Sequence, residues 1–105
     1  MNVSIDLNRT YGRGYLRDSD KVIIEINSWD EVKKLLIGID WAYRHRTITT
    51  YTSNDGSLIT IYRNKENVVV EKFGQQNKLT LDDKGYKRLR EQLVHALKPK
   101  KLLKT

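Results

Sequence analysis

Residues 47–81 read TITTYTSNDGSLITIYRNKENVVVEKFGQQNKLTL, a series of β-branched and aromatic runs separated by turn residues. Asp55-Gly56 is typical of a tight hairpin turn, because both central residues of that turn need a positive φ. Residues 64–67 and 74–77 are two further turn signals. The stretch therefore predicts an antiparallel meander of three or four strands. One face of it is expected to bury Ile59, Ile61, Val69, Phe73, Leu79 and Leu81.

Helical patterns lie on both sides of this meander. Ser28 and Glu31 match the S-x-x-E capping box, in which each side chain bonds a backbone N–H of the other residue. A helix is predicted over Ser28–His45 and a second over about Asp83–Lys98, where Pro99 ends it. Each carries one apolar stripe at helical spacing. The first stripe is Trp29, Val32, Leu35, Leu36, Ile39, Ala42 and Tyr43, and the second is Tyr86, Leu89, Leu93, Ala96 and Leu97.

The N-terminal part of the chain adds β structure. Alternation in residues 3–7 and the β-branched run of residues 21–26 each predict a strand. Gly12-Arg13-Gly14 is read as a hairpin turn, with Tyr11 and Tyr15 paired across it. We therefore predict a single small α+β domain over residues 1–98, in the order β-β-α-β-β-β-β-α. Residues 99–105 are predicted to be a basic, flexible tail.

Composition limits the class of protein. A chain of 105 residues is long enough for one domain and too short for two. It contains no cysteine, which excludes disulfides and thiolate metal sites. No signal peptide or membrane-spanning run is visible, so a cytoplasmic protein without a membrane partner is expected. No motif indicates a cofactor or a small-molecule substrate.

The net charge of +7 is unevenly distributed. Residues 1–20 carry three basic and three acidic groups, whereas residues 82–105 carry eight basic and three acidic groups. The excess therefore gathers at the C-terminal end. Such a distribution indicates a polyanion or an acidic protein surface as partner, although a solvated, solubilising surface has the same composition.

Three features favour nucleic-acid binding. The N-terminal stretch alternates cations with rings that could stack on bases, and if it were extended all five side chains would share one strand face. These residues are Arg9, Tyr11, Arg13, Tyr15 and Arg17. The second helix and the tail offer cations for phosphates: Lys84, Lys87, Arg88, Lys98, Lys100, Lys101 and Lys104. The meander adds Tyr51, Tyr62 and Arg63 as platform residues.

The main hypothesis is thus a small, non-enzymatic nucleic-acid-binding protein with a regulatory or accessory role. DNA and RNA both fit, and single strands are slightly favoured. A combined site requires that residues 9–17 and the basic face of residues 84–98 lie on the same side of the molecule. Otherwise the two groups of residues form separate surfaces.

A second stripe on the first helix supports a different class of function. Lys34, Ile37, Trp41 and Arg44 lie roughly opposite the apolar stripe. Another part of the domain is expected to cover them, because a small domain must bury its large residues. If they are exposed, they form a protein interface, since Trp and Arg dominate interface energetics. The alternative is then a phage or mobile-element type of protein that binds and inhibits a host protein, with homodimerisation as a further option.

Catalytic motifs are absent from the sequence. His45 and His95 lie at the ends of different helices without further ligands at metal-binding spacing, so no metal is assigned. Gly12-Arg13-Gly14 lacks the third glycine of a dinucleotide loop. A small toxin-type ribonuclease that uses Arg, Lys, Tyr and His is the enzymatic alternative left open.

Residues 77–93, NKLTLDDKGYKRLREQL, run from a strand through a cap into a helix. This order is similar to that of compact single-stranded-DNA-binding coactivators, in which a C-terminal helix closes a β-meander. The helix at residues 28–45, which precedes the meander, departs from that order. The similarity concerns the architecture and implies no membership of that family.

Overall fold

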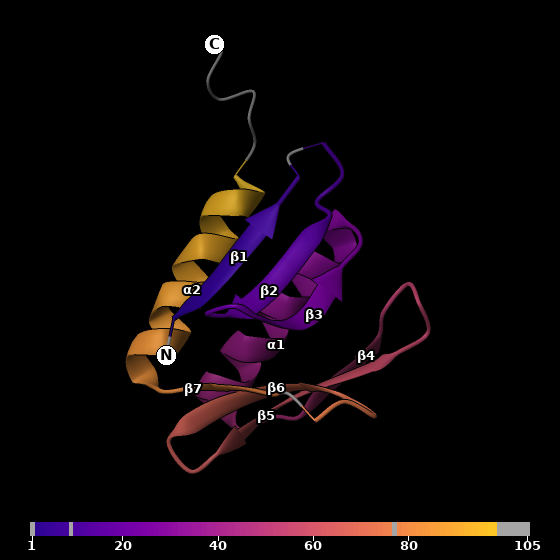
Figure 1. Ribbon diagram of the computed structural model, residues 1–105. Coiled ribbons are helices and arrows are strands. Elements are labelled where there is room, and N and C mark those ends of the chain that lie inside the picture. The colour runs from indigo at the N-terminus through magenta and orange to yellow at the C-terminus, as the bar shows by residue number, and fades with distance from the viewer. Residues whose placement is uncertain (1, 9, 77, 99–105) are drawn as a thin grey trace.

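Seven strands and two helices make up the computed structural model, which describes residues 2–8, 10–76 and 78–98 (Figure 1). In chain order the elements are β1 (Val3–Leu7), β2 (Gly14–Asp18), β3 (Lys21–Ile26), α1 (Trp29–His45), β4 (Thr49–Thr52), β5 (Leu58–Asn64), β6 (Asn67–Lys72), β7 (Lys78–Leu81) and α2 (Asp83–Leu97). The strands form an N-terminal sheet in the order β1-β2-β3 and a C-terminal sheet in the order β4-β5-β6-β7. All neighbouring strands are antiparallel.

The predicted α+β class and both helices are confirmed, and the structure has one strand more than predicted before α1. This extra strand is β2. Its apolar alternation is faint because only Leu16 faces the core, where it pairs with Ile5 and Ile24. Its neighbours on that face are Gly14 and Asp18, which give no apolar pattern. The strand therefore forms because it pairs with β1 on one side and β3 on the other.

The turn between β1 and β2 differs from the prediction. It spans residues 8–13, and its residue Asn8 accepts bonds from the backbone N–H groups of Thr10 (2.8 Å) and Tyr11 (3.1 Å) through its side chain. Tyr15 pairs with Asp6 rather than with Tyr11, so the predicted Tyr11–Tyr15 pair is wrong. Asn8 favours this wider turn because its side chain mimics a backbone turn.

The meander of the C-terminal sheet is confirmed, but one part of its predicted buried face is wrong. Val68 and Val70 pair with Leu81 and Leu79 and face the core, so Val69 lies on the other face of β6, where it is nevertheless buried as predicted. Phe73 lies beyond the end of β6 and is 80% exposed. A shift of one residue in register moves a whole strand to its other face, and the unbroken Val68-Val69-Val70 run gives no alternation to fix it.

The start of α1 is tied to the hairpin between β4 and β5. The Ser28 hydroxyl accepts from the Glu31 N–H (3.3 Å), as the capping box predicts. The Glu31 carboxylate accepts from the N–H of Asn27 (3.2 Å) instead of that of Ser28, and from the N–H of Asn54 (2.8 Å). Glu31 is therefore a buried link between two distant segments as well as a helix cap.

Both predicted helical stripes pack into one core. Val32, Leu35 and Ile39 of α1 are fully buried, as are Leu89 and Leu93 of α2. The α1 helix comes close to the C-terminal sheet at Gly38, where an added Cβ would lie 2.4 Å from the Ile61 Cδ1 atom. The absence of a side chain at this position lets the helix sit directly on β5.

Each half of the chain consists of a meander followed by a helix, and the helices are exchanged. The α1 helix, which follows the N-terminal sheet, packs on β4, β5 and β6 of the C-terminal sheet. The α2 helix, which follows the C-terminal sheet, packs mainly against β1 and α1 (Figure 1). The two helices therefore lie side by side, and α2 also borders the N-terminal sheet along β1.

Candidate nucleic-acid interface

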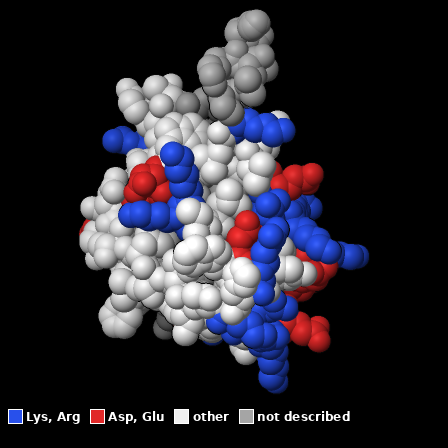
Figure 2. Space-filling view, turned by 180° about the vertical axis from the view of Figure 1, so that it is seen from behind, with Lys and Arg blue, Asp and Glu red and all other residues white. Residues whose placement is uncertain are grey.

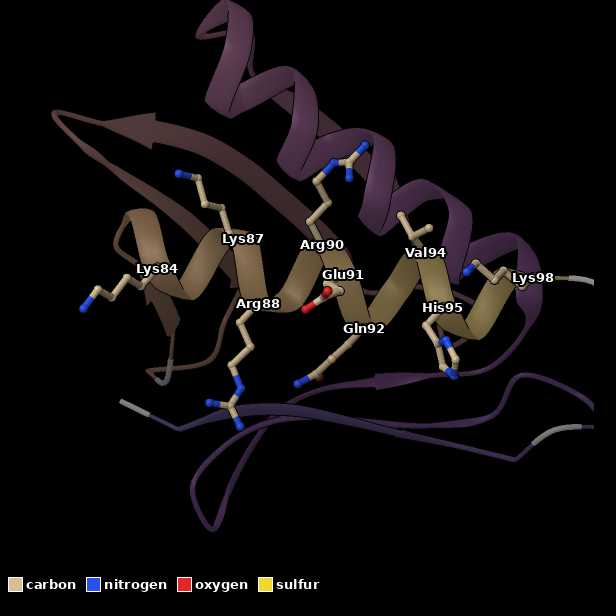
Figure 3. A pocket seen from close by; sticks show the side chains of 9 residues that line it. All are labelled: Lys84, Lys87, Arg88, Arg90, Glu91, Gln92, Val94, His95 and Lys98. Carbon is tan, nitrogen blue, oxygen red and sulfur yellow. The ribbon is translucent and has the colours of Figure 1, made fainter.

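The exposed side of α2 is the most basic helical surface of the described chain. In Figure 3, Lys87, Arg90 and Val94 extend toward α1, whereas Arg88 and His95 extend toward the N-terminal sheet. Together with the other exposed residues of α2 they line an open, shallow depression and no closed cavity. The lining residues are Lys84, Lys87, Arg88, Arg90, Glu91, Gln92, Val94, His95 and Lys98.

Ion pairing leaves part of this charge available. The Lys87 amine pairs with Asp83 at 3.0 Å, one helical turn away. The Arg90 guanidinium pairs with Asp40 of α1 at 3.0 Å. Within the described ranges, Lys84, Arg88 and Lys98 form no ion pair with an acidic side chain. These three cations are therefore available to a polyanion.

An aromatic pair locks the two helices together. The rings of Tyr43 of α1 and Tyr86 of α2 stack with centroids 3.9 Å apart and planes 8° from parallel. The Tyr43 hydroxyl donates to Asp83, and the Arg63 guanidinium of β5 lies 4.7 Å from the Tyr43 ring centroid. Arg63 also donates to the Tyr43 carbonyl, so it holds the C-terminal end of α1 in place.

Asp83 is the charged centre of this junction. The hydrogen bond from Tyr43 is the largest cause that holds the pKa of the Asp83 carboxyl below its usual range, and the hydrogen bond from Lys87 adds to it. The same hydrogen bonds raise the pKa of Tyr43 and of Lys87. Asp83 is therefore ionised near neutral pH, and it holds Lys87 beside the C-terminal end of α1.

A second contact between the helices is formed by Asp40. It accepts from the Tyr86 hydroxyl at 2.5 Å and from the Arg90 guanidinium at 3.0 Å. Burial is the largest cause that raises the pKa of the Tyr86 hydroxyl, and the hydrogen bond to Asp40 raises it further. The hydroxyl therefore stays protonated and donates its hydrogen bond to Asp40. Three polar contacts (Tyr43–Asp83, Tyr86–Asp40 and Arg90–Asp40) and one aromatic stack therefore join α1 to α2.

We call the exposed side of this pair the two-helix surface. It comprises Lys33, Lys34, Ile37, Trp41 and Arg44 of α1 together with Lys84, Lys87, Arg88, Glu91 and Lys98 of α2. Figure 2, which views the molecule from behind, shows a broad uncharged area with Lys and Arg side chains on both sides of it, and Asp and Glu side chains lie among them. The basic side chains are most numerous along the edge where α2 lies.

The expectation that another part of the domain covers the α1 stripe is wrong. Trp41 is 52% exposed and Ile37 is 47% exposed. The C-terminal sheet packs on the side of α1 that carries Gly38, and α2 packs on the side that carries Asp40 and Tyr43. No described element lies over Trp41, so a large aromatic residue faces solvent next to cations.

The N-terminal arginines and tyrosines do not join this surface. Tyr15 and Arg17 lie on the outer face of β2, opposite Leu16, and Ile5 and Leu7 face inward with Leu16. Because α2 packs against β1 from the inner side, the outer face of this sheet points away from it. The structure therefore separates the two groups of residues that a combined site would require.

The alternating stretch is also not one continuous strand face. Tyr11 and Arg13 lie in the loop before β2, and Arg9 lies outside the described residues. The Arg13 guanidinium lies 5.6 Å from the Tyr11 ring centroid, and the Arg17 guanidinium lies 5.1 Å from that of Tyr15. Arg17 also pairs with Asp6 at 3.6 Å. These rings and cations therefore interact with one another.

The remaining proposed contacts are distributed as follows. Lys100, Lys101 and Lys104 lie outside the described residues. Tyr51 is buried against the core, so the expectation that it is an exposed platform is wrong. The Tyr62 hydroxyl donates to Glu71 at 3.2 Å on the outer face of the C-terminal sheet. Of the three proposed platform residues of the meander, Arg63 is the one that lies near the two-helix surface.

Sequence reasoning missed the polar residues that hold the helices together. Asp40 and Tyr43 are three residues apart and thus lie on one side of α1. Their partners Arg90 and Tyr86 are four residues apart on α2. One signal could have predicted this pairing: Asp40 lies beside the apolar stripe of the first helix, and Arg90 lies beside that of the second helix.

No group of three or more His, Asp and Glu side chains in residues 2–8, 10–76 and 78–98 is arranged to hold a metal ion. Among the same residues, no helix has the length and apolar character needed to cross a bilayer.

Replacement of Asp83 by Asn is expected to reduce the loss of stability in acid. A carboxyl whose pKa is lowered by folding stabilises the protein above its unfolded pKa, and this stabilisation is lost as the pH falls through the folded value. For Asp83 that window lies below about pH 4. Melting temperatures measured between about pH 2 and 7 test this, with Asp82→Asn on the neighbouring cap as the comparison. An unchanged pH dependence in Asp83→Asn would contradict the assignment.

No protein-family model, no curated protein and no solved structure matches this chain, so the two-helix surface is interpreted from its own geometry.

Proposed function

We propose that the chain is a small, non-enzymatic nucleic-acid-binding protein and that the two-helix surface contacts the phosphate backbone. The observation that carries this proposal is the set of cations on α2 that have no acidic partner within the described chain: Lys84, Arg88 and Lys98. Phosphate contacts supply most of the affinity of nucleic-acid-binding proteins, and lysine and arginine provide them.

Two properties of the surface support this role. Asp83 pairs with Lys87 of α2 and also accepts a hydrogen bond from Tyr43 of α1. Arg44 is the residue after Tyr43 on α1. Basic side chains of both helices therefore meet where the helices cross. The fixed helix pair also supports the role, because cations on rigid elements lose less conformational freedom when they bind a phosphate chain.

The triple variant Lys84→Gln, Arg88→Gln, Lys98→Gln is expected to weaken binding to oligonucleotides and to reduce its salt dependence. Each phosphate contact contributes about 0.7 units to the slope of log K against log salt for single strands. Loss of three contacts should therefore reduce the slope by about two units. Fluorescence anisotropy of a labelled oligonucleotide at several salt concentrations measures both effects.

The matched control removes the same charge from another side of the molecule. Arg13→Gln, Arg17→Gln, Lys21→Gln lowers the net charge equally but leaves the two-helix surface intact. This control should bind almost as tightly as the unmodified chain. Equal weakening by both triple variants would show that net charge alone drives binding, and absence of binding at low salt would overturn the proposed function.

A further inference from the structure

Trp41 is one of several exposed large apolar residues of the described chain, and it lies on a helix beside cations. It projects from the C-terminal half of α1 with half of its surface exposed, and Ile37 lies four residues earlier, about 6 Å along the axis. The buried stripe of the same helix is complete without it. A large exposed ring has a hydration cost that a partner would relieve.

The neighbours of Trp41 on α1 are cations at both ends. Lys33 and Lys34 lie about two turns before it, and Arg44 lies about one turn after it. Lys34 is held 3.2 Å from Asp30, whereas Lys33 and Arg44 form no ion pair with an acidic side chain among the described residues. The stripe therefore presents an aromatic ring between positive charges.

This charge pattern argues against a second copy of the chain as the occupant. In a two-fold contact centred between Ile37 and Trp41, the antiparallel helices would place Lys34 of one copy opposite Arg44 of the other. Like charges brought together in this way disfavour association. The pattern fits instead a ligand that alternates negative charge with flat apolar groups.

We propose that Trp41 is a base-stacking platform and that the ligand of the two-helix surface is single-stranded nucleic acid. This inference rests on the proposed function and adds the class of substrate. Unpaired bases have free faces that stack on exposed aromatic rings, whereas the bases of a duplex are already stacked on one another. The cations on both sides of the ring would then follow the phosphates of the same strand.

Tryptophan fluorescence tests this inference directly. The chain has two tryptophans, and Trp29 is partly buried against the core. Titration with an oligothymidine strand is expected to quench the Trp41 emission, and a hairpin duplex of equal charge should quench it little. The Trp41→Phe variant, which retains only Trp29 as the emitter, should lose this quenching.

Affinity measurements with variants separate stacking from charge. Trp41→Ala is expected to weaken single-strand binding roughly 5- to 150-fold, which corresponds to the loss of one base–aromatic stack. Trp41→Phe should retain most of the affinity. Phe73→Ala, which removes an exposed aromatic ring beyond the end of β6 and outside the two-helix surface, should change it little. Duplex binding should be unaffected in all three variants. Because Trp41 is half exposed, the melting temperature of Trp41→Ala should stay close to that of the unmodified chain.

Each contrary result has a distinct meaning. If Trp41→Ala weakens single-strand and duplex binding equally, the platform is overturned while the proposed function stands. If no oligonucleotide binds at low salt, the proposed function itself fails, and the platform with it. Tight, Trp41-dependent binding of poly-L-glutamate in place of oligonucleotides would assign the stripe to an acidic protein. Trp41-dependent dimerisation in sedimentation experiments would assign it to a second copy, and either result overturns the inference.

Discussion

Replacement of Gly14 by alanine is expected to destabilise the domain by about 3–5 kcal/mol. A Cβ atom at this position would lie 1.6 Å from the Asp6 carbonyl oxygen and 2.7 Å from its carbonyl carbon. Both atoms belong to the backbone of β1, which cannot move aside without opening the β1–β2 ladder. Gly14 pairs with Leu7 on one side and Ile26 on the other, so the whole N-terminal sheet would be disturbed.

Urea denaturation measures this loss of stability, and Gly56→Ala is the matched control. Gly56 lies in the hairpin turn with a φ of 87°, and no atom lies within 4 Å of its added Cβ. Its replacement should cost only about 1 kcal/mol, from the positive φ alone. If the two variants lose the same stability, the close approach at Gly14 is not a constraint on the fold.

Glu31→Ala is expected to reduce the free energy of unfolding by about 2–4 kcal/mol. The variant removes both hydrogen bonds of the buried carboxylate, to the backbone N–H groups of Asn27 and Asn54. The loss therefore affects the start of α1 and the β4–β5 hairpin together. Replacement of an exposed glutamate should have a much smaller effect, because most surface substitutions change the free energy of unfolding by about 0.5 kcal/mol or less.

Two variants define the origin of this loss. Glu31→Gln keeps one oxygen acceptor and should recover part of the stability. Glu91→Ala on the exposed side of α2 removes the same kind of side chain and should be close to neutral. Thermal or urea denaturation of the three proteins in parallel gives the comparison. A Glu31→Ala protein as stable as Glu91→Ala would contradict the bridging role of the carboxylate.

Local chemistry was sufficient to predict most elements of the fold. The Ser28–Glu31 capping box, Pro99 and the apolar stripes predict both helices, because such signals act within one or two turns. The turn at Asp55-Gly56 likewise needs only its own residues. Pairing over longer distances was harder to predict. β2 depends on two neighbouring strands, and the face of β6 on which Val69 lies is fixed by the pairing of its neighbours rather than by its own polarity.

The candidate site was predictable only in part. The basic side of α2 follows from helical spacing and is present as predicted. Exposure of Trp41 could not be predicted, because it depends on which sides of α1 the other elements occupy. The separation of Tyr15 and Arg17 from α2 depends in turn on the packing of α2 against β1, a contact between opposite ends of the chain.

The exchange of helices between the two halves has a consequence for biosynthesis. The strand β1 is made first, but its apolar face is closed by α2, about 80 residues later in the chain. At 5–20 residues per second, translation leaves that face without its helix for roughly 4–16 s. The nascent N-terminal sheet is thus incomplete until α2 has been made, so its final packing depends on a helix from the other end of the domain.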